Sequence, residues 1–322
     1  MKVLITGGAG YIGSFMVKSL LDEGHEVTVI DNLERGHREA VDARAKFFKT
    51  DIRSIDEMEK IFVEYEFEAI IHFAGLISVE ESTRNPQLYE EVNVDGSRNL
   101  FSTAIKHGVK RFIFSSTAAV YGNPEIVPIP ENHAKNPTSP YGRTKLRVEE
   151  ILSELREKDP EISFSCLRYF NASGAALDGS MGEAHEPETH IIPLAIRAVK
   201  ESKSFNLYGT DYDTPDGTCL RDYIHILDLI EAHKLALKKI TDEKGGYFYN
   251  VGTGIGISNL EVVEMVEKVS GLKMKIEEAD RRSGDADRLI ADATKITNEL
   301  GFNPKYSDLN TIAESAWKWH SK

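Results

Sequence analysis

The 322-residue sequence contains only two cysteines, Cys166 and Cys219. Two cysteines are too few for a disulfide framework and too isolated for a structural zinc site, so a reducing, cytoplasmic setting is expected. No apolar run approaches the roughly 20 residues that a membrane-spanning helix needs. The opening residues, MKVLITGG, lack the form of a secretion signal. The sequence therefore predicts a soluble protein with no membrane partner.

Basic residues are also fewer than acidic ones, since the sequence has 39 Lys and Arg residues and 52 Asp and Glu residues, which gives a formal net charge of -13. This balance disfavours nucleic acid and anionic membranes as partners. The sequence has no fixed-period repeat, low-complexity tract or proline-rich linker, so any domain boundary is expected inside compact structure. Its 41% apolar content is sufficient for a sizeable core in one large or two ordinary domains.

Short β-branched runs alternate with amphipathic stretches through the first half of the chain. Strands are predicted at residues 2–6, 26–31, 46–52, 68–75, 110–116 and 162–170. Helical spacing of apolar residues fills the gaps, for example at 55–65 and 141–158, and Gly24 is a stop for the first helix. This alternation predicts an α/β fold with a doubly wound parallel sheet of the Rossmann type.

The pattern changes after about residue 171, where loops bearing glycine and proline separate shorter elements. We expect a dinucleotide-binding domain at 1–171 and a smaller α/β substrate-binding domain at 172–221 and 253–322. Residues 222–252 again have the pattern of a helix followed by a strand, like those in the first half of the chain. They are expected to return to the first domain.

Gly7, Gly10 and Gly13 lie in the segment GGAGYIG between the first predicted strand and helix. Glycines in this setting let backbone amides approach a pyrophosphate at a helix N-terminus, here with Tyr11 and Ile12. The spacing is GxxGxxG and departs from the GxGxxG fingerprint. A tight turn needed only for helix packing is the alternative, but it does not explain the carboxylate that follows about 20 residues later.

That carboxylate is Asp31, at the end of the second predicted strand, where it can accept hydrogen bonds from ribose hydroxyls. Its charge would repel a 2'-phosphate, so NAD is the expected cofactor rather than its phosphorylated form, and Arg35 and Arg38 weaken this argument only slightly. Further cofactor contacts are expected from Asn32 after the second strand, from Asp51 and Ile52 at the end of the third strand, and from Phe73, Ala74 and Gly75 at the end of the fourth. Asp51 and Ile52 are expected to contact the adenine.

Tyr141 and Lys145 form a YxxxK pair at the start of a predicted helix, where spacing i, i+4 places them on one face. Such a pair arises easily by chance, but Thr117 at the end of the strand FIFSST supplies a companion hydroxyl. A tyrosine with its ordinary pKa of about 10 is a poor base at neutral pH, a deficit of ~4 kcal/mol. We expect Lys145 and a nicotinamide charge to lower the Tyr141 pKa, and Thr117 to orient a sugar hydroxyl.

With GGAGYIG, Asp31, SST and YGRTK in place, the chain resembles the extended short-chain dehydrogenase/reductases. The later motifs IHFAGL, LRYFNASGA, YGTDYDTPDGTCLRDYIHILDL and RRSGD are similar to those of the UDP-glucose 4-epimerases, over essentially the full length. The resemblance implies that Tyr141 deprotonates O4 while the C4 hydride passes to a retained NAD. The resulting 4-keto sugar then turns over and is reduced from its other face.

The resemblance also implies a UDP-sugar site in the second domain, where arginines can clamp a diphosphate. The implied substrate residues, besides Thr117 and Tyr141, are Asn171, His190, Leu207, Tyr208, Arg221, Tyr223, Arg282, Asp285 and Leu289, and Phe170 is an implied cofactor contact. The resemblance further implies a homodimer formed through helices near residues 93–107 and 141–158.

Two positions depart from the family pattern. Ile77 stands where many members carry a cofactor-contacting lysine, which puts one NAD contact in doubt. Leu289 stands where some members have a tyrosine lining the sugar pocket. Because a smaller side chain leaves space, we expect N-acetylated UDP-hexoses to be accepted as well.

Several other interpretations stay open from the residues alone. Arg221 and Asp222 can form an ion pair that closes a loop, and Asn171, His225 and Asp228 suit helix or strand ends. The segment with His185, Glu186, Glu188 and His190 has metal-ligand residue types, but the expected reaction needs no metal.

Rival functions are a sugar 4,6-dehydratase or decarboxylase and a non-catalytic NAD-sensing regulator. The dehydratase and decarboxylase patterns need acidic residues after the threonine, where this chain has Ala118 and Ala119. A regulator would have no need of Thr117, Tyr141 and Lys145 together, although fold alone does not exclude it.

Overall fold

A computed structural model describes residues 1–282 and 285–322 of the chain, which divide into two compact units. The first unit comprises residues 1–122, 135–168 and 232–249, and the second comprises residues 123–134, 169–231 and 250–322. Helix α8 (Ile226–Asp242) contributes to both units. Among the described residues, no helix combines the length and apolar character that crossing a membrane requires.

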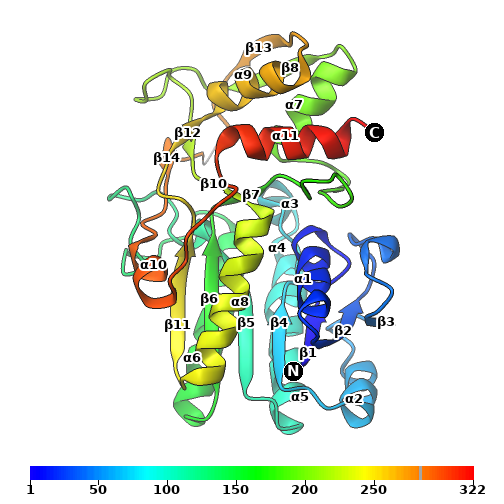
Figure 1. Cartoon of the computed structure of the whole chain (residues 1–322). Coiled ribbons are helices and arrows are strands. Elements are labelled where there is room, and N and C mark those ends of the chain that lie inside the picture. The colour runs from blue at the N-terminus through cyan, green and yellow to red at the C-terminus, as the bar shows by residue number, and fades with distance from the viewer. Residues whose placement is uncertain (283–284) are drawn as a thin grey trace. The chain divides into compact units, whose positions relative to one another are not determined.

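A seven-stranded sheet forms the centre of the first unit, with the order β11-β6-β5-β4-β1-β2-β3 (Figure 1). Strand β1 pairs in parallel with β2 and β4, β2 with β3, and β4 with β5. The strands are β1 (Lys2–Thr6), β2 (Glu26–Asp31), β3 (Lys46–Lys49), β4 (Ala69–His72), β5 (Arg111–Thr117), β6 (Ser163–Tyr169) and β11 (Gly246–Val251). The predicted doubly wound sheet is confirmed.

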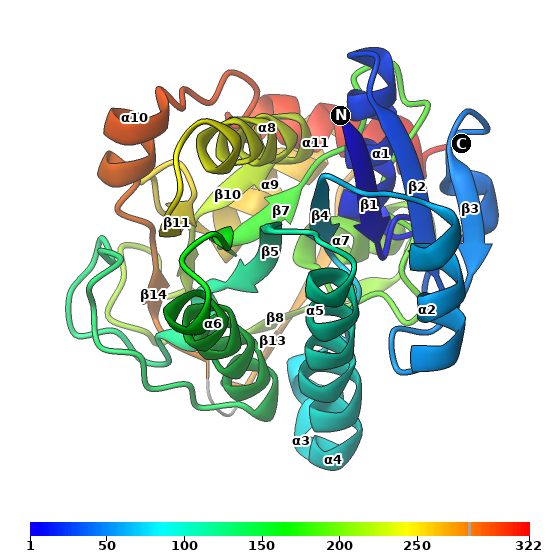
Figure 2. The ribbon, with the colours of Figure 1, turned by 90° about the horizontal axis from the view of Figure 1, so that it is seen from below.

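Helices cover both faces of this sheet, with α2, α5 and α6 on one face and α1 and α8 on the other (Figure 2). The helices and helical turns of the first unit are α1 (Tyr11–Asp22), η1 (Arg38–Ala40), α2 (Ile55–Glu64), α3 (Val79–Arg84), α4 (Pro86–Tyr89), the π-helix η2 (Glu90–Asp95), α5 (Gly96–Lys106), η3 (Ala118–Val120) and α6 (Pro140–Lys158). The helix α1 ends two residues before Gly24, which has φ 82°, close to its predicted stop.

The core of the first unit lies between the sheet and the helices α2, α5 and α6. Leu4, Ile70 and Phe112 project from three strands and are fully buried with Phe101 of α5 and Leu152 of α6. Continuous apolar runs of this kind suit strands that are covered on both faces. This burial fixes the strand positions, and so fixes the loops that follow each strand at one edge of the sheet.

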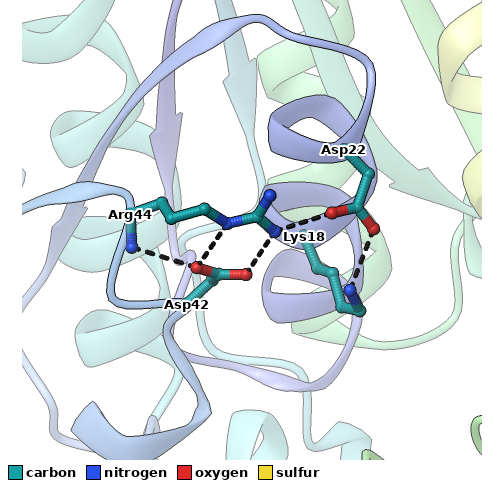
Figure 3. A network of polar contacts seen from close by, with 4 residues as sticks. All are labelled: Lys18, Asp22, Asp42 and Arg44. Atoms are coloured by element: carbon teal, nitrogen blue, oxygen red, sulfur yellow. Dashed lines mark hydrogen bonds and ion pairs between the residues drawn. The ribbon is translucent and has the colours of Figure 1, made fainter.

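A charged network on the surface holds the end of α1 to the turn before β3 (Figure 3). Arg44 donates to Asp42 through Nε at 3.0 Å and lies 2.7 Å from Asp22, which also accepts from Lys18 at 2.9 Å. The guanidinium lowers the pKa of Asp42 to about 2. Because these side chains are exposed, solvent screening keeps their contribution to stability small.

The described part of the second unit is built from small sheets, the start of α8 and further helices. Strands β7 (Asn171–Ser173) and β10 (Tyr223–His225) pair in parallel, as do β8 (Ser204–Tyr208) and β13 (Lys275–Ala279), and β9 (Leu220–Arg221) lies between β12 (Ile257–Ser258) and β14 (Arg288–Leu289). The helices are α7 (Ile191–Lys200), α9 (Asn259–Ser270), α10 (Thr294–Leu300) and α11 (Leu309–His320). Apolar residues of α7, α9 and α11 pack with β8 in a separate core.

Candidate active site

The three glycines of the first loop meet different surroundings between β1 and α1. A Cβ on Gly7 would lie 2.5 Å from the Ala74 nitrogen, and one on Gly13 would lie 2.1 Å from the Gly7 oxygen, so both positions require glycine. A Cβ on Gly10 would meet only the Gly7 oxygen, at 3.4 Å. The loop is therefore tightly packed on the protein side and open above Gly10, where α1 begins.

The N-terminus of α1 has the features of a phosphate site. Gly10 is its N-cap and provides no side chain to accept from the first amides, which include those of Tyr11 and Ile12. The first amides of a helix have no carbonyl partner within it and carry the positive end of the helix dipole. The side chain of Tyr11 is turned away into the interior, with its ring 5.8 Å from that of Phe15.

Asp31 ends β2, as predicted, and its carboxylate is buried beside the glycine loop. Its Oδ2 accepts from the Ala9 amide at 3.0 Å and its Oδ1 from the Leu33 amide at 2.9 Å. Burial raises the pKa of this carboxyl, while the two amides act to lower it. Each carboxylate oxygen has capacity for a second bond, so Asp31 can still accept from ribose hydroxyls.

The residues expected around the adenine lie just beyond β3. Asn32 donates to Asp51 at 2.9 Å, and Arg53 makes an ion pair with the same carboxylate at 2.7 Å. The Arg53 guanidinium lowers the pKa of Asp51 to about 2. Strand β3 ends at Lys49, so Asp51 and Ile52 follow the strand rather than end it, and the Ile52 side chain is buried in the core.

Phe73, Ala74 and Gly75 also follow their strand, since β4 ends at His72. The amides of Phe73 and Ala74 both donate to the Thr6 oxygen, at 2.9 and 3.1 Å, which holds this segment beside the glycine loop. Ile77, two residues later, is exposed. An isoleucine there gives no charged contact, which is the departure noted from the sequence.

The structure brings Thr117, Tyr141 and Lys145 together. Thr117 ends β5, and Tyr141 and Lys145 lie in the first turns of α6, whose N-cap Ser139 accepts from the Gly142 amide at 3.1 Å. The Thr117 side chain lies beside the Tyr141 phenol and acts to lower its pKa. The Lys145 ammonium lies 6.0 Å from the centre of the Tyr141 ring and donates to the Ser115 carbonyl at 2.8 Å.

The expected lowering of the Tyr141 pKa includes the nicotinamide charge and stays a prediction. In the chain alone, burial raises the pKa of Tyr141 to about 12, and the nearby Thr117 side chain offsets only part of this rise. Burial also lowers the pKa of Lys145 to about 8. Both shifts have one cause, since a buried site penalises the charged form of each group. A phenolate at Tyr141 therefore requires positive charge beyond that supplied by the chain.

Asn93 is a site residue that sequence reasoning missed. It is buried in the π-helix η2, and its side chain accepts from the Leu76 amide at 2.8 Å and donates to the Leu76 carbonyl at 3.0 Å. It also donates to the Thr144 hydroxyl at 3.1 Å, which ties the segment after β4 to α6. Single-turn π-helices are frequent at functional sites, but no pattern in the sequence marks this one.

A buried ion pair behind the site was also missed. Arg168 of β6 donates to Glu149 of α6 through Nε at 2.9 Å and Nη2 at 2.7 Å, and both side chains are almost fully buried. Glu149 also accepts from the Ser116 hydroxyl at 2.6 Å, next to Thr117. The pair joins β5, β6 and α6 at the positions that carry Thr117, Tyr141 and Lys145.

In the second unit, the implied diphosphate residues form one group. Arg221 lies 3.8 Å from Asp285, Arg282 lies 3.4 Å from the same carboxylate, and the Arg282 guanidinium lies 4.8 Å from the centre of the Tyr208 ring. Ser283 and Gly284 of the RRSGD motif lie outside the described residues. Two arginines that converge in this way can bind a diphosphate.

Among the described residues, Arg221 and Asp222 have other partners and do not form an ion pair with each other, so that alternative is wrong. Asp222 is fully buried and accepts from the amides of Thr253, Gly254 and Ala291 at 2.8 to 3.1 Å. Arg221 instead donates to the carbonyls of Leu220 and Ala286. The Asp222 carboxylate thus holds two loops, and the Arg221 guanidinium turns toward Asp285.

The residues assigned to helix starts have different partners. His225 does cap α8, because its Nδ1 accepts from the Leu227 amide at 3.1 Å. Asp228 accepts from the amides of Lys305 and Tyr306, each at 2.8 Å, so it holds a distant loop rather than a helix start. Asn171 lies within β7, where its side chain donates to the Asp222 carbonyl at 3.0 Å.

The remaining residues implied by the resemblance differ in how deeply they are buried. Asn171, His190 and Tyr223 line one small pocket of the second unit, and Leu289 pairs with Arg221 in the sheet of β9 and β14. The Leu207 side chain is buried in the core of that unit, which leaves its main chain for a ligand contact. Phe170 lies half-buried between β6 and β7.

Comparison with known proteins decides the family. The model of the NAD dependent epimerase/dehydratase family matches residues 3–252. The chain belongs to this family. It is 44% identical over 321 residues to the UDP-glucose 4-epimerase of Lactobacillus helveticus, a match that covers 99% of this chain and 97% of that protein.

Two solved structures in the family share the fold. A UDP-glucose 4-epimerase from Brucella ovis in complex with NAD has a TM-score of 0.94 and 41% identity, covering 98% of this chain and 97% of that one. The UDP-Glc/GlcNAc 4-epimerase of Campylobacter jejuni has a TM-score of 0.87 and 42% identity, covering 99% of both chains.

Proposed function

We propose that this chain is a UDP-glucose 4-epimerase that interconverts UDP-galactose and UDP-glucose with tightly held NAD. The observation that carries the proposal is the cluster of Thr117, Tyr141 and Lys145 at the end of β5 and the start of α6. Family membership and the named relatives agree with it. The proposed reaction oxidises C4 of the sugar to a ketone and reduces it again from the other face.

The residues of the first unit fit NAD. The open space above Gly10 and the amides that start α1 suit a pyrophosphate, and Asp31 retains lone pairs for ribose hydroxyls. When bound, NAD supplies the hydride acceptor for C4 and a positive nicotinamide charge that favours the Tyr141 phenolate. A 2'-phosphate would meet the buried negative charge of Asp31, so NAD is preferred.

Tyr141 is the proposed base that takes the proton from O4 of the sugar and later returns it. With the pKa of Tyr141 at about 12, forming its phenolate at neutral pH costs about 7 kcal/mol. Positive charge within a few ångströms offsets this cost, and Lys145 provides part of it from the same helix. Thr117 lies beside the phenol and is proposed to orient the substrate hydroxyl toward it.

A dehydratase or decarboxylase is the weaker proposal for the same family. Such enzymes need a carboxyl group immediately after the threonine to move a further proton. Ala118 and Ala119 occupy those positions, in the turn η3, and neither side chain can transfer a proton.

The second unit is proposed to bind the UDP-sugar. Arg221 and Arg282 supply charge for the diphosphate. Asn171, His190 and Tyr223 line a pocket of this unit. The domain bounds predicted from the sequence, 172–221 and 253–322 for the sugar nucleotide and 1–171 with 222–252 for NAD, stay a prediction. The second compact unit differs from them, since it also includes residues 123–134, 169–171, 222–231 and 250–252.

Replacing Tyr141 by Phe is the direct test of the base. Tyr141→Phe removes the ionisable hydroxyl and keeps the ring, so kcat should fall by roughly 10² to 10⁴ while NAD remains bound. Conversion of UDP-galactose to UDP-glucose without added NAD measures the first effect, and NAD released on denaturation measures the second. Wild-type protein that contains NAD yet gives no product would refute the proposed reaction, and full activity of Tyr141→Phe would refute the base.

We also propose activity on N-acetylated UDP-hexoses, because Leu289 is smaller than the tyrosine of some family members. The Campylobacter relative, named for both UDP-Glc and GlcNAc, makes such a substrate range reasonable in this family. Leu289→Tyr should lower turnover of UDP-N-acetylgalactosamine by roughly tenfold or more and leave UDP-galactose turnover nearly unchanged. Leu289→Ile is the control, and wild-type protein inactive on the N-acetylated sugar would contradict the idea.

A homodimer is proposed through the helices α5 and α6, as the family resemblance implies. Light scattering on purified protein should give twice the 36.0 kDa mass of one chain. A mass of one chain at micromolar concentration would rule the dimer out.

A further inference from the structure

A cluster of four side chains in the second unit takes no part in the proposed proton and hydride transfer, although one of them, His190, also lines the proposed sugar-nucleotide pocket. It comprises Glu183, His185, Glu188 and His190 and is termed here the His–Glu cluster. One possible ligand atom from each residue lies within 4.8 Å of every other. No other group of three or more histidine, cysteine or acidic residues gathers in this way within residues 1–282 and 285–322.

The two histidines converge on one oxygen of Glu183, and Glu188 lies beside one of them. Glu183 Oε1 lies 2.8 Å from His185 Nδ1, and His190 Nδ1 hydrogen-bonds to the same atom. Glu188 Oε1 lies 3.6 Å from His190 Nδ1. Four ligands at ~2.0 to 2.2 Å from a tetrahedral ion would be roughly 3.3 to 3.6 Å apart. Both histidine nitrogens lie closer than this to Glu183 Oε1, and all four ligand atoms lie within 4.8 Å of one another, so side-chain movements would complete a tetrahedron.

Burial and charge also favour a cation. The Glu183 and Glu188 side chains are only 4% and 7% exposed, so two carboxylates come close together away from water. Two buried negative charges repel each other, and a divalent cation would neutralise both. The segment is already positioned by its surroundings, since Trp319 donates to the Glu183 carbonyl at 2.7 Å and Glu188 accepts the amides of Thr189 and His190.

We propose that the His–Glu cluster binds a divalent transition-metal ion of the zinc class. Two imidazoles and two carboxylates suit Zn²⁺ or Co²⁺, whereas Mg²⁺ and Ca²⁺ prefer ligand sets made of oxygen alone. The ion takes no part in proton transfer, which is assigned to Tyr141. Its expected effect is to fix residues 183–190, which lead directly into α7.

His190 gives the site a functional consequence, which rests on the proposed function. Because His190 lines a pocket with Asn171 and Tyr223, an ion that holds its imidazole withdraws it from a sugar nucleotide. Added Zn²⁺ should therefore raise the KM for UDP-galactose in wild-type protein, and less so in His185→Gln.

A titration of tag-free, chelator-treated protein with Co²⁺ tests the site without relying on activity. Tetrahedral Co²⁺ has strong visible absorption, and we expect this band to saturate at one ion per chain. His185→Gln and, separately, Glu188→Gln should weaken binding by roughly tenfold or more. Two variants are used so that a failure of one to fold does not remove the test.

His107→Gln is the matched control. His107 pairs with Glu59 at 2.8 Å and has similar exposure to His185, but it lies outside the His–Glu cluster. It should leave Co²⁺ affinity unchanged. Absence of the band in wild-type protein, or equal affinity in wild type and folded His185→Gln, would overturn the metal site whether or not the epimerase proposal holds.

Discussion

At the scale of single residues, the glycines of the loop between β1 and α1 differ in the space that surrounds them. Gly13 packs so closely on the Gly7 carbonyl that a methyl group has no room, while Gly10 faces open space. The two positions have the same residue type for different physical reasons. Gly13 is required by the contact between loop and helix, and we expect Gly10 to be required only when a ligand approaches the backbone.

This difference predicts opposite outcomes for two alanine substitutions. Gly13→Ala should destabilise the protein, because its Cβ would lie 2.1 Å from a backbone oxygen that is held in the loop. Gly10→Ala should keep the unfolding midpoint within a few degrees but lose most of the retained NAD. Thermal unfolding with and without NAD, and cofactor release on denaturation, measure the two effects. Equal stability losses in the two variants would contradict this assignment.

At the scale of elements, the helix α6 carries the proposed catalytic pair Tyr141 and Lys145 and is held by buried polar contacts. Its residue Glu149 accepts from Arg168 of β6 and from Ser116 of β5. Tyr141 and Lys145 lie one to two turns earlier on the same helix. The buried ion pair therefore sets the position of α6 against the two strands that flank it.

Removal of one charge from this pair should be costly. Glu149→Gln leaves the Arg168 guanidinium buried without a counter-charge, and we expect a loss of roughly 3 to 5 kcal/mol in the free energy of unfolding. Glu154→Gln on the same helix breaks an exposed pair with Arg147 and should cost less than about 1 kcal/mol. Urea denaturation compares the two variants. Similar losses in the free energy of unfolding would show that burial does not determine how much each ion pair contributes to stability.

At the scale of the whole molecule, buried histidines set how stability depends on pH. Burial lowers the pKa of His72 to about 3, with the Lys145 charge adding to the effect, and burial lowers that of His225 to about 4. The unfolded chain binds protons at these histidines near pH 6.5, whereas the folded chain does not. The contribution of these two histidines to stability is therefore full above about pH 6.5 and falls as the pH decreases toward 4.

Each histidine should lower the free energy of unfolding by about 2 kcal/mol between about pH 7 and pH 5. The variant His72→Gln removes one titrating group, so its stability should change with pH by about 2 kcal/mol less than that of wild type over this range. Urea denaturation at the two pH values tests this, independently of any loss common to both. An unchanged pH dependence would mean that His72 is protonated in the folded protein.

The sequence by itself determined the doubly wound sheet, the glycine loop with Asp31, and the grouping of Thr117 with Tyr141 and Lys145. Each of these rests on local spacing, because strands of period 2, helices of period 3.6 and fixed loop lengths bring the named residues to one edge of a parallel sheet. The positions of side chains that follow such strands could therefore be predicted without knowledge of long-range packing.

Only the tertiary structure decided the partners of buried polar groups. Asn93 reaches Leu76 and Thr144, Glu149 reaches Arg168, and Asp222 reaches loops 31 to 69 residues away, none at a spacing that a pattern reveals. The sign of the Tyr141 pKa shift belongs here too, since burial depends on every element that covers the phenol. Desolvation and long-range hydrogen bonds arise from the packed molecule, so they follow the fold and cannot be obtained from residue order alone.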